Sequence, residues 1–594
     1  MTTTATPTTA PSMATSGRGR WIGLAMLSLG VSMIIVDATI VNVAVPSIIK
    51  DLNLDLTAAE WVNTSYALVF AALLVTLGRI GDVIGRRRMY LGGLVVFLIA
   101  SVLAGTAQTG EWLIAARLLQ GVGGAAILPS TQSILNANFR GKDRAIAFGI
   151  WGSVIGGMAA VGPLLGGFLT TYVSWRWAFF INIPIGLIAI AGTLRYIGES
   201  RDEHAKPGFD FPGFILITLG LGGIVFALIE GQTYGWLQPK RPFTVAGWTW
   251  PSTEVSIIPF ILVGGAIALV LFAIVELRRR RAGKFYLFDF TMWRYPGFRY
   301  GNLAGTIVSL GEFGLLFVLP LFLQAVLGLS AFETGALLIS LAVGSFFAAP
   351  GAAAMAKRFG PRRVVTAGMA LEAIGILWTT LLISSDVNVW LFVPPLFIYG
   401  LGVGFATAQL TSIVLGDVPP RESGLASGTN STMRQVGSAL GIAILGTVLA
   451  AGLSSGVRTQ LAEHAPQVPE AAREGFAIAI EQSAGQAITA FRGDPAQLVG
   501  SGLVPAEFES FLSSPAAKPV LEQVVTAGED AFVDAARTAG FVALGFVLLG
   551  LLFSFLLPKQ KMHVLERIGP EEPVRAVARP EGDGAAPTGT PAEA

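Results

Sequence analysis

Cysteine is absent from this sequence of 594 residues, which excludes a disulfide framework, a thiolate metal site and a cysteine nucleophile. Histidine is rare, and His204, His464 and His563 all fall in polar segments, which argues against histidine catalysis or zinc binding within a membrane. No Gly-x-x-x-x-Gly-Lys-Ser/Thr loop occurs, so the chain has no P-loop with which ATP could drive a pump. We therefore expect no metal and no cofactor.

Charged side chains are scarce as well. Asp, Glu, Lys and Arg make up 13% of the residues, about half the share found in soluble proteins. Hydrophobic residues reach 53% and the mean hydropathy is +0.65, which is more apolar surface than a soluble core needs to bury. The formal net charge of +2 gives no reason to expect a nucleic-acid partner. The expected surroundings are a lipid bilayer.

Fourteen apolar stretches are long enough to cross the hydrocarbon layer, because about 20 residues at about 1.5 Å per residue span about 30 Å. Backbone groups in lipid must be hydrogen-bonded within the segment, so these stretches must be helices. We predict an all-α membrane protein with fourteen transmembrane helices. They run over residues 21–46, 57–78, 88–107, 111–134, 145–171, 177–198, 212–231, 254–277, 300–324, 331–354, 364–384, 389–415, 423–452 and 535–557.

Lysine and arginine gather in alternate connecting segments, a bias that predicts both termini and these segments on the cytoplasmic side of the inner or plasma membrane. The predicted order is a disordered cytoplasmic N-terminus (1–20), a six-helix half (21–198), a linker with two inserted helices (199–284), a second six-helix half (285–557) and a disordered cytoplasmic tail (558–594). The second half includes an external segment, 453–534, which either folds as a small cap or stays a solvated loop.

Two short turns with paired arginines indicate an internal repeat. Gly-Arg-Ile-Gly-Asp-Val-Ile-Gly-Arg-Arg-Arg runs from Gly78 to Arg88, and Lys-Arg-Phe-Gly-Pro-Arg-Arg runs from Lys357 to Arg363. The two turns occupy equivalent places if the seventh and eighth spans are an insertion between two halves of six. Duplicated halves around a central site are a transporter design.

At these residues the sequence resembles the major facilitator superfamily, specifically its fourteen-span drug:proton antiporter branch, over nearly every span. The turn from Gly78 to Arg88 is similar to the signature between helices 2 and 3, and Asp37 to Pro46 to the first-helix signature. The segment from Arg117 to Gly124 is similar to the helix 4 motif, and Trp175 to Pro184 to the link into helix 6.

The helix 5 motif of the family is met in part. Gly149, the pair Gly162-Pro163 and the pair Gly166-Gly167 match it, whereas Met158 stands where the pattern has another glycine. The spacing of small residues on this span favours close approach of another backbone. The functional interpretation is a contact between the two halves that seals one side, and the alternative is helix packing without a gating role.

The resemblance implies a proton-coupled secondary transporter that exports amphipathic organic compounds by alternating access, as in multidrug efflux, with the proton gradient in place of a cofactor. The alternative on the same fold is export of a lipid or an endogenous metabolite. An intramembrane enzyme or a sensor is a third, less favoured interpretation. The expected partners are an amphipathic or lipidic small molecule, protons and the bilayer.

Asp37 is the first candidate for proton coupling. It lies about 24 Å along the first span, where an ionised carboxylate costs about 2.5 to 3.5 kcal/mol unless it faces a polar cavity or takes a proton. The resemblance implies a proton-coupling role, and the alternative is a carboxylate hydrogen-bonded to a neighbouring helix. Asn42 belongs to the same signature.

Arg117 and Gln120 share a face of the fourth span, and a buried guanidinium needs an acid, carbonyl groups or water. The resemblance links Arg117 to proton transfer, while a structural brace is the alternative.

The ninth span carries Glu312 on a polar stripe. Asn302, Thr306 and Ser309 precede it at helical spacing, which predicts that the stripe lines a cavity. Glu312 is then a second proton site, an anchor for a cationic substrate or a structural partner. Asn430 and Arg434 share one face of span 13 and raise the same question. Glu372 is expected only to snorkel toward the cytoplasmic surface.

The turn after the second span is predicted to hold the cytoplasmic face closed in one state through ion pairs and contacts with a helix dipole. Arginines in such a turn also serve membrane orientation alone. Asp82 is unnecessary for orientation, so it favours the first role. The residues assigned to this device are Gly78, Asp82, Gly85, Arg86 and Arg87.

Overall fold

The computed structural model describes residues 17–558 except 53, 55, 202–209, 246–247, 420–421, 467, 469, 484 and 494–516. The predicted disordered tail after Pro558 and most of the predicted disordered N-terminus therefore lie outside the described residues. The first helix begins at Gly17, so Arg18 and Arg20 belong to it and not to a disordered segment.

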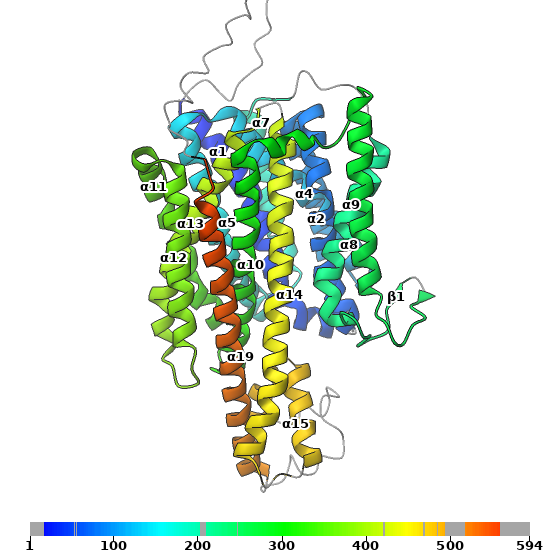
Figure 1. The fold of residues 1–594 in the computed structure, drawn as a ribbon, viewed down its shortest axis with the longest axis vertical. Coiled ribbons are helices and arrows are strands. Elements are labelled where there is room, and N and C mark those ends of the chain that lie inside the picture. The colour runs from blue at the N-terminus through cyan, green and yellow to red at the C-terminus, as the bar shows by residue number, and fades with distance from the viewer. Residues whose placement is uncertain are drawn as a thin grey trace, which may run out of the picture.

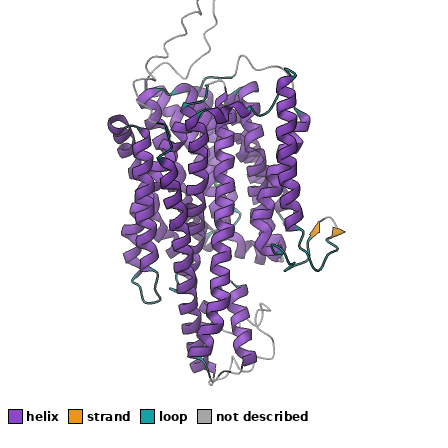
Figure 2. Ribbon diagram, viewed as in Figure 1, coloured by secondary structure: helices purple, strands orange, loops and turns teal. Residues whose placement is uncertain are grey.

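The described chain is a helical bundle with one short β-hairpin (Figures 1 and 2). The first helices are α1 (Gly17–Leu52), α2 (Leu56–Ile84), α3 (Arg86–Gly105), α4 (Gly110–Asn138), α5 (Gly141–Tyr172), α6 (Trp177–Phe180) and α7 (Asn182–Tyr196). They are followed by α8 (Phe211–Tyr234), β1 (Thr244–Val245), β2 (Trp248–Thr249), α9 (Ile258–Arg281) and the 3-10 helix η1 (Phe290–Arg294).

The remaining elements are α10 (Pro296–Ala325), α11 (Ala331–Phe359), α12 (Pro361–Leu382), η2 (Val389–Phe392), α13 (Val393–Gly416), α14 (Ser423–His464), α15 (Glu470–Gln482), α16 (Gln486–Arg492) and α19 (Ala517–Ser554). Twelve helices of the described residues are long and apolar enough to cross a membrane. Each predicted apolar stretch overlaps a helix, and the sixth is interrupted at Ile181 between α6 and α7. We call α1–α7 the N-terminal half, and α10–α14 with α19 the C-terminal half.

The two arginine-rich turns share a backbone feature that only glycine adopts without strain. Gly85 precedes α3 with φ of 119°, and Gly360 precedes α12 with φ of 87°. Each glycine therefore ends one long helix and starts the next in a sharp turn. The backbone thus repeats at the positions where the sequence repeats.

The bundle is built from contacts within each half and a few between them. In the N-terminal half α1 packs against α5, and α4 against α2 and α3. In the C-terminal half α13 packs against α11 and α12, and α10 against α14 and α19. The halves meet where α5 contacts α11 and where α2 contacts α14.

Helices α8 and α9 pack on each other at one side of the bundle, and α8 contacts α2 and α14 (Figure 1). The outer face of α9 exposes large apolar side chains, including Phe260, Val263 and Val270. Such a face is stable in lipid and costly in water, which fits the membrane setting. A buried hydrogen bond from Thr64 Oγ1 of α2 to Glu230 Oε1 of α8, 2.9 Å long, ties this pair to the N-terminal half.

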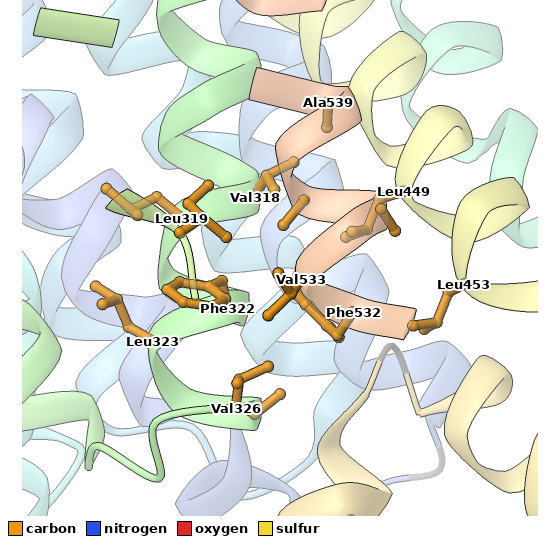
Figure 3. Close-up of a cluster of buried hydrophobic side chains, with 14 of the residues drawn as sticks. Val318, Leu319, Phe322, Leu323, Val326, Leu449, Leu453, Phe532, Val533 and Ala539 are labelled. Atoms are coloured by element: carbon orange, nitrogen blue, oxygen red, sulfur yellow. The ribbon is translucent and has the colours of Figure 1, made fainter. Parts of the chain in front are cut away.

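Helices α14 and α19 continue far beyond the others and carry α15 with them (Figures 1 and 2). The 42 residues of α14 reach about 63 Å, about twice the hydrocarbon thickness. The apolar core between α14, α15 and α19 continues into the bundle, where Phe532 and Val533 of α19 lie near Leu449 of α14 and Phe322 of α10 (Figure 3). The described part of segment 453–534, which the sequence predicts to be external, is therefore mainly helical and packed onto the C-terminal half. After that prediction we call it the external extension.

Candidate functional site

Asp37 lies at the centre of a buried polar cluster in the N-terminal half. Arg117 Nη1 donates to Asp37 Oδ2 over 2.5 Å, while Gln120 Nε2 and Asn182 Nδ2 donate to Asp37 Oδ1 over 3.0 and 2.8 Å. Ser101 Oγ accepts from the same two amide groups. Asp37, Gln120 and Ser101 have no exposed surface, and Arg117 and Asn182 have 1%. Four helices, α1, α3, α4 and α7, therefore converge on one carboxylate.

Arg117 is held from several sides. Its Nη1 also donates to Gln120 Oε1 over 2.8 Å, and its Nε donates to the Val62 carbonyl of α2 over 3.1 Å. The guanidinium stacks over the Tyr66 ring at 4.3 Å from the ring centre, which adds a cation–π attraction. Arginine is always charged in proteins, so a proton taken by Asp37 would leave Arg117 without its counter-charge. The two groups can thus couple protonation to a rearrangement of α1 against α4.

Sequence reasoning placed Asp37, Arg117 and Gln120 among the candidates, and the structure brings them into direct contact. It missed Asn182 and Ser101. Asn182 belongs to the quoted link into helix 6, and it starts α7 directly after the interruption at Ile181, so the motif itself carried the signal. Ser101 belongs to no recognisable sequence motif.

The polar stripe on α10 faces α14. Thr306 Oγ1 donates to the Met433 carbonyl over 3.2 Å, and Asn430 Nδ2 donates to Asn302 Oδ1 over 3.0 Å. At least part of the predicted cavity lining is therefore a contact between these two helices. Asn302 is fully buried in it.

Glu312 and Arg434 form the charged part of this interface. Arg434 Nη2 lies 3.5 Å from Glu312 Oε2, and Arg434 Nη1 donates to Thr407 Oγ1 of α13 over 3.2 Å. The expectation that Glu372 snorkels to the surface is wrong. Its side chain belongs to α12 and has no exposed surface. It packs against Gly402 of α13, and the missing side chain of this glycine lets the two helices approach.

Asp82 links the two halves at the end of the bundle where α2 meets α3. Its carboxylate accepts from the Gly424 and Leu425 backbone N–H groups, both over 2.9 Å, at the start of α14. Arg86 donates to the same carboxylate from Nε and Nη2 over 2.9 and 2.7 Å. The free N–H groups and positive dipole end of α14 suit an anion. We call these four residues the α2–α14 latch.

Gly78 permits this approach, because a Cβ there would lie 2.5 Å from the Gly424 carbonyl oxygen of the opposite half. Gly85 faces Glu199, whose carboxylate accepts from the backbone N–H groups of Arg87 and Arg88 over 3.0 and 3.1 Å. Glu199 therefore caps the start of α3, a role that the sequence did not reveal. Arg87 also donates from Nη2 to the Leu194 carbonyl over 3.1 Å.

Further hydrogen bonds join the halves at this same end. Ser133 Oγ and Ser427 Oγ are 2.9 Å apart, and Asn136 Nδ2 donates to the Leu415 carbonyl over 3.5 Å. Arg144 of α5 donates to the carbonyl of Ser412 near the end of α13. The two halves are thus in contact by polar groups at the α2–α3 end.

The small residues of α5 have two different partners. A Cβ on Gly162 would lie 1.8 Å from Thr39 Oγ1 of α1, so Gly162 serves packing within the N-terminal half. Gly167, in contrast, packs on Phe332 of α11 in the opposite half at ordinary contact distance. The contact between halves along α5 therefore includes Gly167 but not Gly162.

The other assigned positions on these helices are less informative. Gly149 and Gly166 are buried in α5. The side chains of Asn42 and Pro163 lie outside the described residues. Within the described ranges, no group of three or more His, Asp or Glu side chains is arranged to hold a metal ion.

Comparison with known proteins identifies the family. Residues 27–442, and in a second match 301–565, fit the model of the Major Facilitator Superfamily. A probable actinorhodin transporter of Streptomyces coelicolor is 34% identical over 440 residues, 72% of each chain. Multidrug resistance protein 3 of Bacillus subtilis is 33% identical over 426 residues, 71% of this chain and 78% of its own.

A puromycin resistance protein of Streptomyces alboniger is 34% identical over 436 residues, which cover 72% of this chain and 82% of that protein. The crystal structure of a human organic anion transporter aligns with a TM-score of 0.50 and 13% identity over 73% of this chain and 94% of its own, which shows a shared fold. The chain belongs to the Major Facilitator Superfamily. It is an all-helical, multi-pass membrane transporter and not an enzyme.

Proposed function

We propose that this transporter exports amphipathic organic compounds across the cell membrane in exchange for protons, by alternating access. The observation that carries the proposal is the Asp37 cluster, in which a fully buried carboxylate accepts hydrogen bonds from one fixed guanidinium and two amide groups. Protonation of Asp37 changes the net charge of a buried site, and therefore the preferred arrangement of the helices around it. The relatives named for multidrug and puromycin resistance support the choice of cargo.

The energy source fits this chemistry. Each proton that moves inward along the membrane potential releases about 2.3 kcal/mol per 100 mV, in addition to any term from the pH gradient. This free energy supports concentrative export without ATP. In the cycle, Asp37 takes a proton from the outer solution and gives it to the cytoplasm, while cargo moves in the opposite direction.

We infer fourteen membrane spans with both termini in the cytoplasm. Helices α5 and α11, with 32 and 29 residues, lie in the bundle beside the twelve apolar helices, which supports the total. The arginine-rich turns before α3 and α12 then face the cytoplasm together, as the positive-inside bias requires. The external extension lies on the opposite side of the membrane. In this orientation the α2–α14 latch holds the cytoplasmic side closed.

A second cargo class has its own support. The Streptomyces coelicolor relative is named as a transporter of actinorhodin, and a relative of Streptomyces glaucescens, 31% identical over 434 residues, is named for tetracenomycin C resistance and export. Export of an endogenous metabolite is therefore the alternative to export of foreign drugs. Both cargo classes are proposed to use the same proton site at Asp37.

The experiment is transport into everted membrane vesicles with cationic, neutral and lipidic compounds, with and without a proton gradient. Asp37→Asn keeps the shape of the side chain and removes its titration, so we expect gradient-dependent transport to fall at least tenfold. Asp386→Asn makes the same change at an exposed aspartate and is expected to transport normally. Wild-type transport by Asp37→Asn would contradict the proposal.

A further inference from the structure

In the interior of the C-terminal half, two acids, Glu312 and Glu372, face a single base, Arg434. Glu312 and Glu372 are 6% and 0% exposed, and Arg434 faces them from α14. Arg434 Nη2 lies 3.5 Å from Glu312 Oε2, whereas both carboxyl oxygens of Glu372 lack a hydrogen-bond donor in the described structure. Glu372 is therefore a fully buried acid without a donor, next to a pair that is already neutral.

The helices around Glu372 offer no further positive charge at this depth. Tyr399 of α13 lies close to both carboxyls, but its hydroxyl donates to the Glu312 backbone carbonyl over 3.1 Å. Between the ends of α10, α11, α12 and α13, and in the parts of α14 and α19 that pack beside them, the only ionisable side chains are Glu312, Glu372, Tyr399 and Arg434; α19 runs alongside α12 from Gly540, next to Thr380, to Ser554, next to Thr366. The charged residues of α19 nearest to this part are Asp534 and Arg537, and Arg537 donates to the Ile383 carbonyl beyond the end of α12.

These charges decide the protonation of the site. If both carboxyls were ionised, one negative charge would remain buried without a partner, which is strongly unfavourable. One proton on the pair makes the whole group neutral, as in other sites where two carboxyls lie near each other. The geometry therefore requires a proton in this conformation, and Glu372 is the carboxyl that Arg434 leaves unpaired.

We propose that Glu312 and Glu372 form a second proton-binding site, separate from Asp37, in which Glu372 carries the proton while Arg434 pairs with Glu312. Loading forms one carboxyl O–H bond with a proton from outer water, and unloading returns that proton to water on the cytoplasmic side. The inference rests on the proposed proton exchange. It adds that more than one proton moves in each cycle.

The first test reads the proton directly by infrared spectroscopy of the full-length protein in lipid, where a protonated carboxyl has its own C=O stretch. In the wild-type-minus-variant difference spectrum, Glu372→Gln and Glu312→Gln are each expected to show loss of one carboxylic-acid band. Arg434→Gln is expected to gain one, because both carboxyls then need protons. Glu522→Gln, at an exposed glutamate of the same half, should leave the carboxylic-acid C=O region of the spectrum unchanged.

A spectrum in which neither glutamine variant loses the band overturns the second proton site and leaves the proposal for Asp37 intact. The second test measures the number of protons exchanged per substrate from the voltage at which flux reverses in liposomes. We expect this number to fall by one in Glu372→Gln. An unchanged number, or a loss of cationic transport alone with no spectral change, also overturns the inference.

Discussion

At the scale of single residues, the Asp37–Arg117 pair is the most consequential contact of the N-terminal half. Arg117→Gln would leave the Asp37 carboxylate buried without its counter-charge. Removing one partner of a buried ion pair typically costs about 3 to 5 kcal/mol. We therefore expect a loss of this size in the free energy of unfolding in detergent, part of which returns when Asp37→Asn is added. Equal stability of the single and double variants would contradict the charge argument.

Asp51 and Arg176 provide the matched control, because they form the same kind of pair at the partly exposed end of α1. Neutralising Arg176 there should cost at most about 1 kcal/mol. The hydrogen bonds from Arg176 and then Trp175 hold the pKa of Asp51 below its ordinary value. The small stabilisation by this pair is therefore present at neutral pH and is lost as the pH falls through that lowered pKa.

At the scale of elements, the turn between α2 and α3 depends on a backbone conformation that a side chain disfavours. Gly85 has φ of 119°, and a Cβ there would lie 2.6 Å from the Glu199 carboxyl carbon. Gly85→Ala should lower the free energy of unfolding by about 1 to 3 kcal/mol. Gly92→Ala lies inside α3 with open space around it, so it should be neutral or stabilising by up to about 1 kcal/mol. Equal effects of the two changes would contradict this account.

The α2–α14 latch is expected to set the balance between the conformation in which this end of the bundle is closed and the one in which it is open. Asp82→Asn loses the charge that caps α14 and pairs with Arg86, so the latch end of the bundle, cytoplasmic in the proposed orientation, should open more often. Because the chain has no cysteine, Ser431→Cys on the buried face of α14 can report access to a maleimide reagent in everted vesicles. We expect labelling to rise several-fold.

The control for this measurement is Asp143→Asn. Asp143 lies at the same end of the bundle, where it pairs with Arg20 over 3.4 Å, and both side chains are partly exposed. Its neutralisation removes the same charge without touching α14. If both variants label alike, the effect reports net charge and the latch interpretation fails.

At the scale of the whole molecule, the sequence predicted more of the bundle than of its interior. Apolar stretches of spanning length leave the backbone no alternative to helix, so each overlaps one. Asp37 and Arg117 were found because a buried charge stands out in an apolar span. Glu372 was misinterpreted, and the partner of Gly162 stayed open between the two halves and its own half, because position along a helix does not say which neighbouring helix a given face meets. Only the packing of α12 on α13 and of α5 on α1 decides these contacts.

The proposed alternating access predicts that the two halves move against each other, while α14 and α19 move together as one body, including their parts in the external extension. The serine oxygens of Ser133 and Ser427 are 2.9 Å apart across the halves, so a disulfide formed by Ser133→Cys with Ser427→Cys should abolish transport until it is reduced. The control lies within the extension, where a Cβ on Gly456 would be 3.2 Å from the Ala531 Cβ. Cross-linking Gly456→Cys to Ala531→Cys joins α14 to α19 and should leave transport above half of the wild-type rate. Full transport with the first cross-link in place would show that the halves do not separate at the α2–α3 end during the cycle. Loss of transport with the second cross-link would show that α14 and α19 slide against each other.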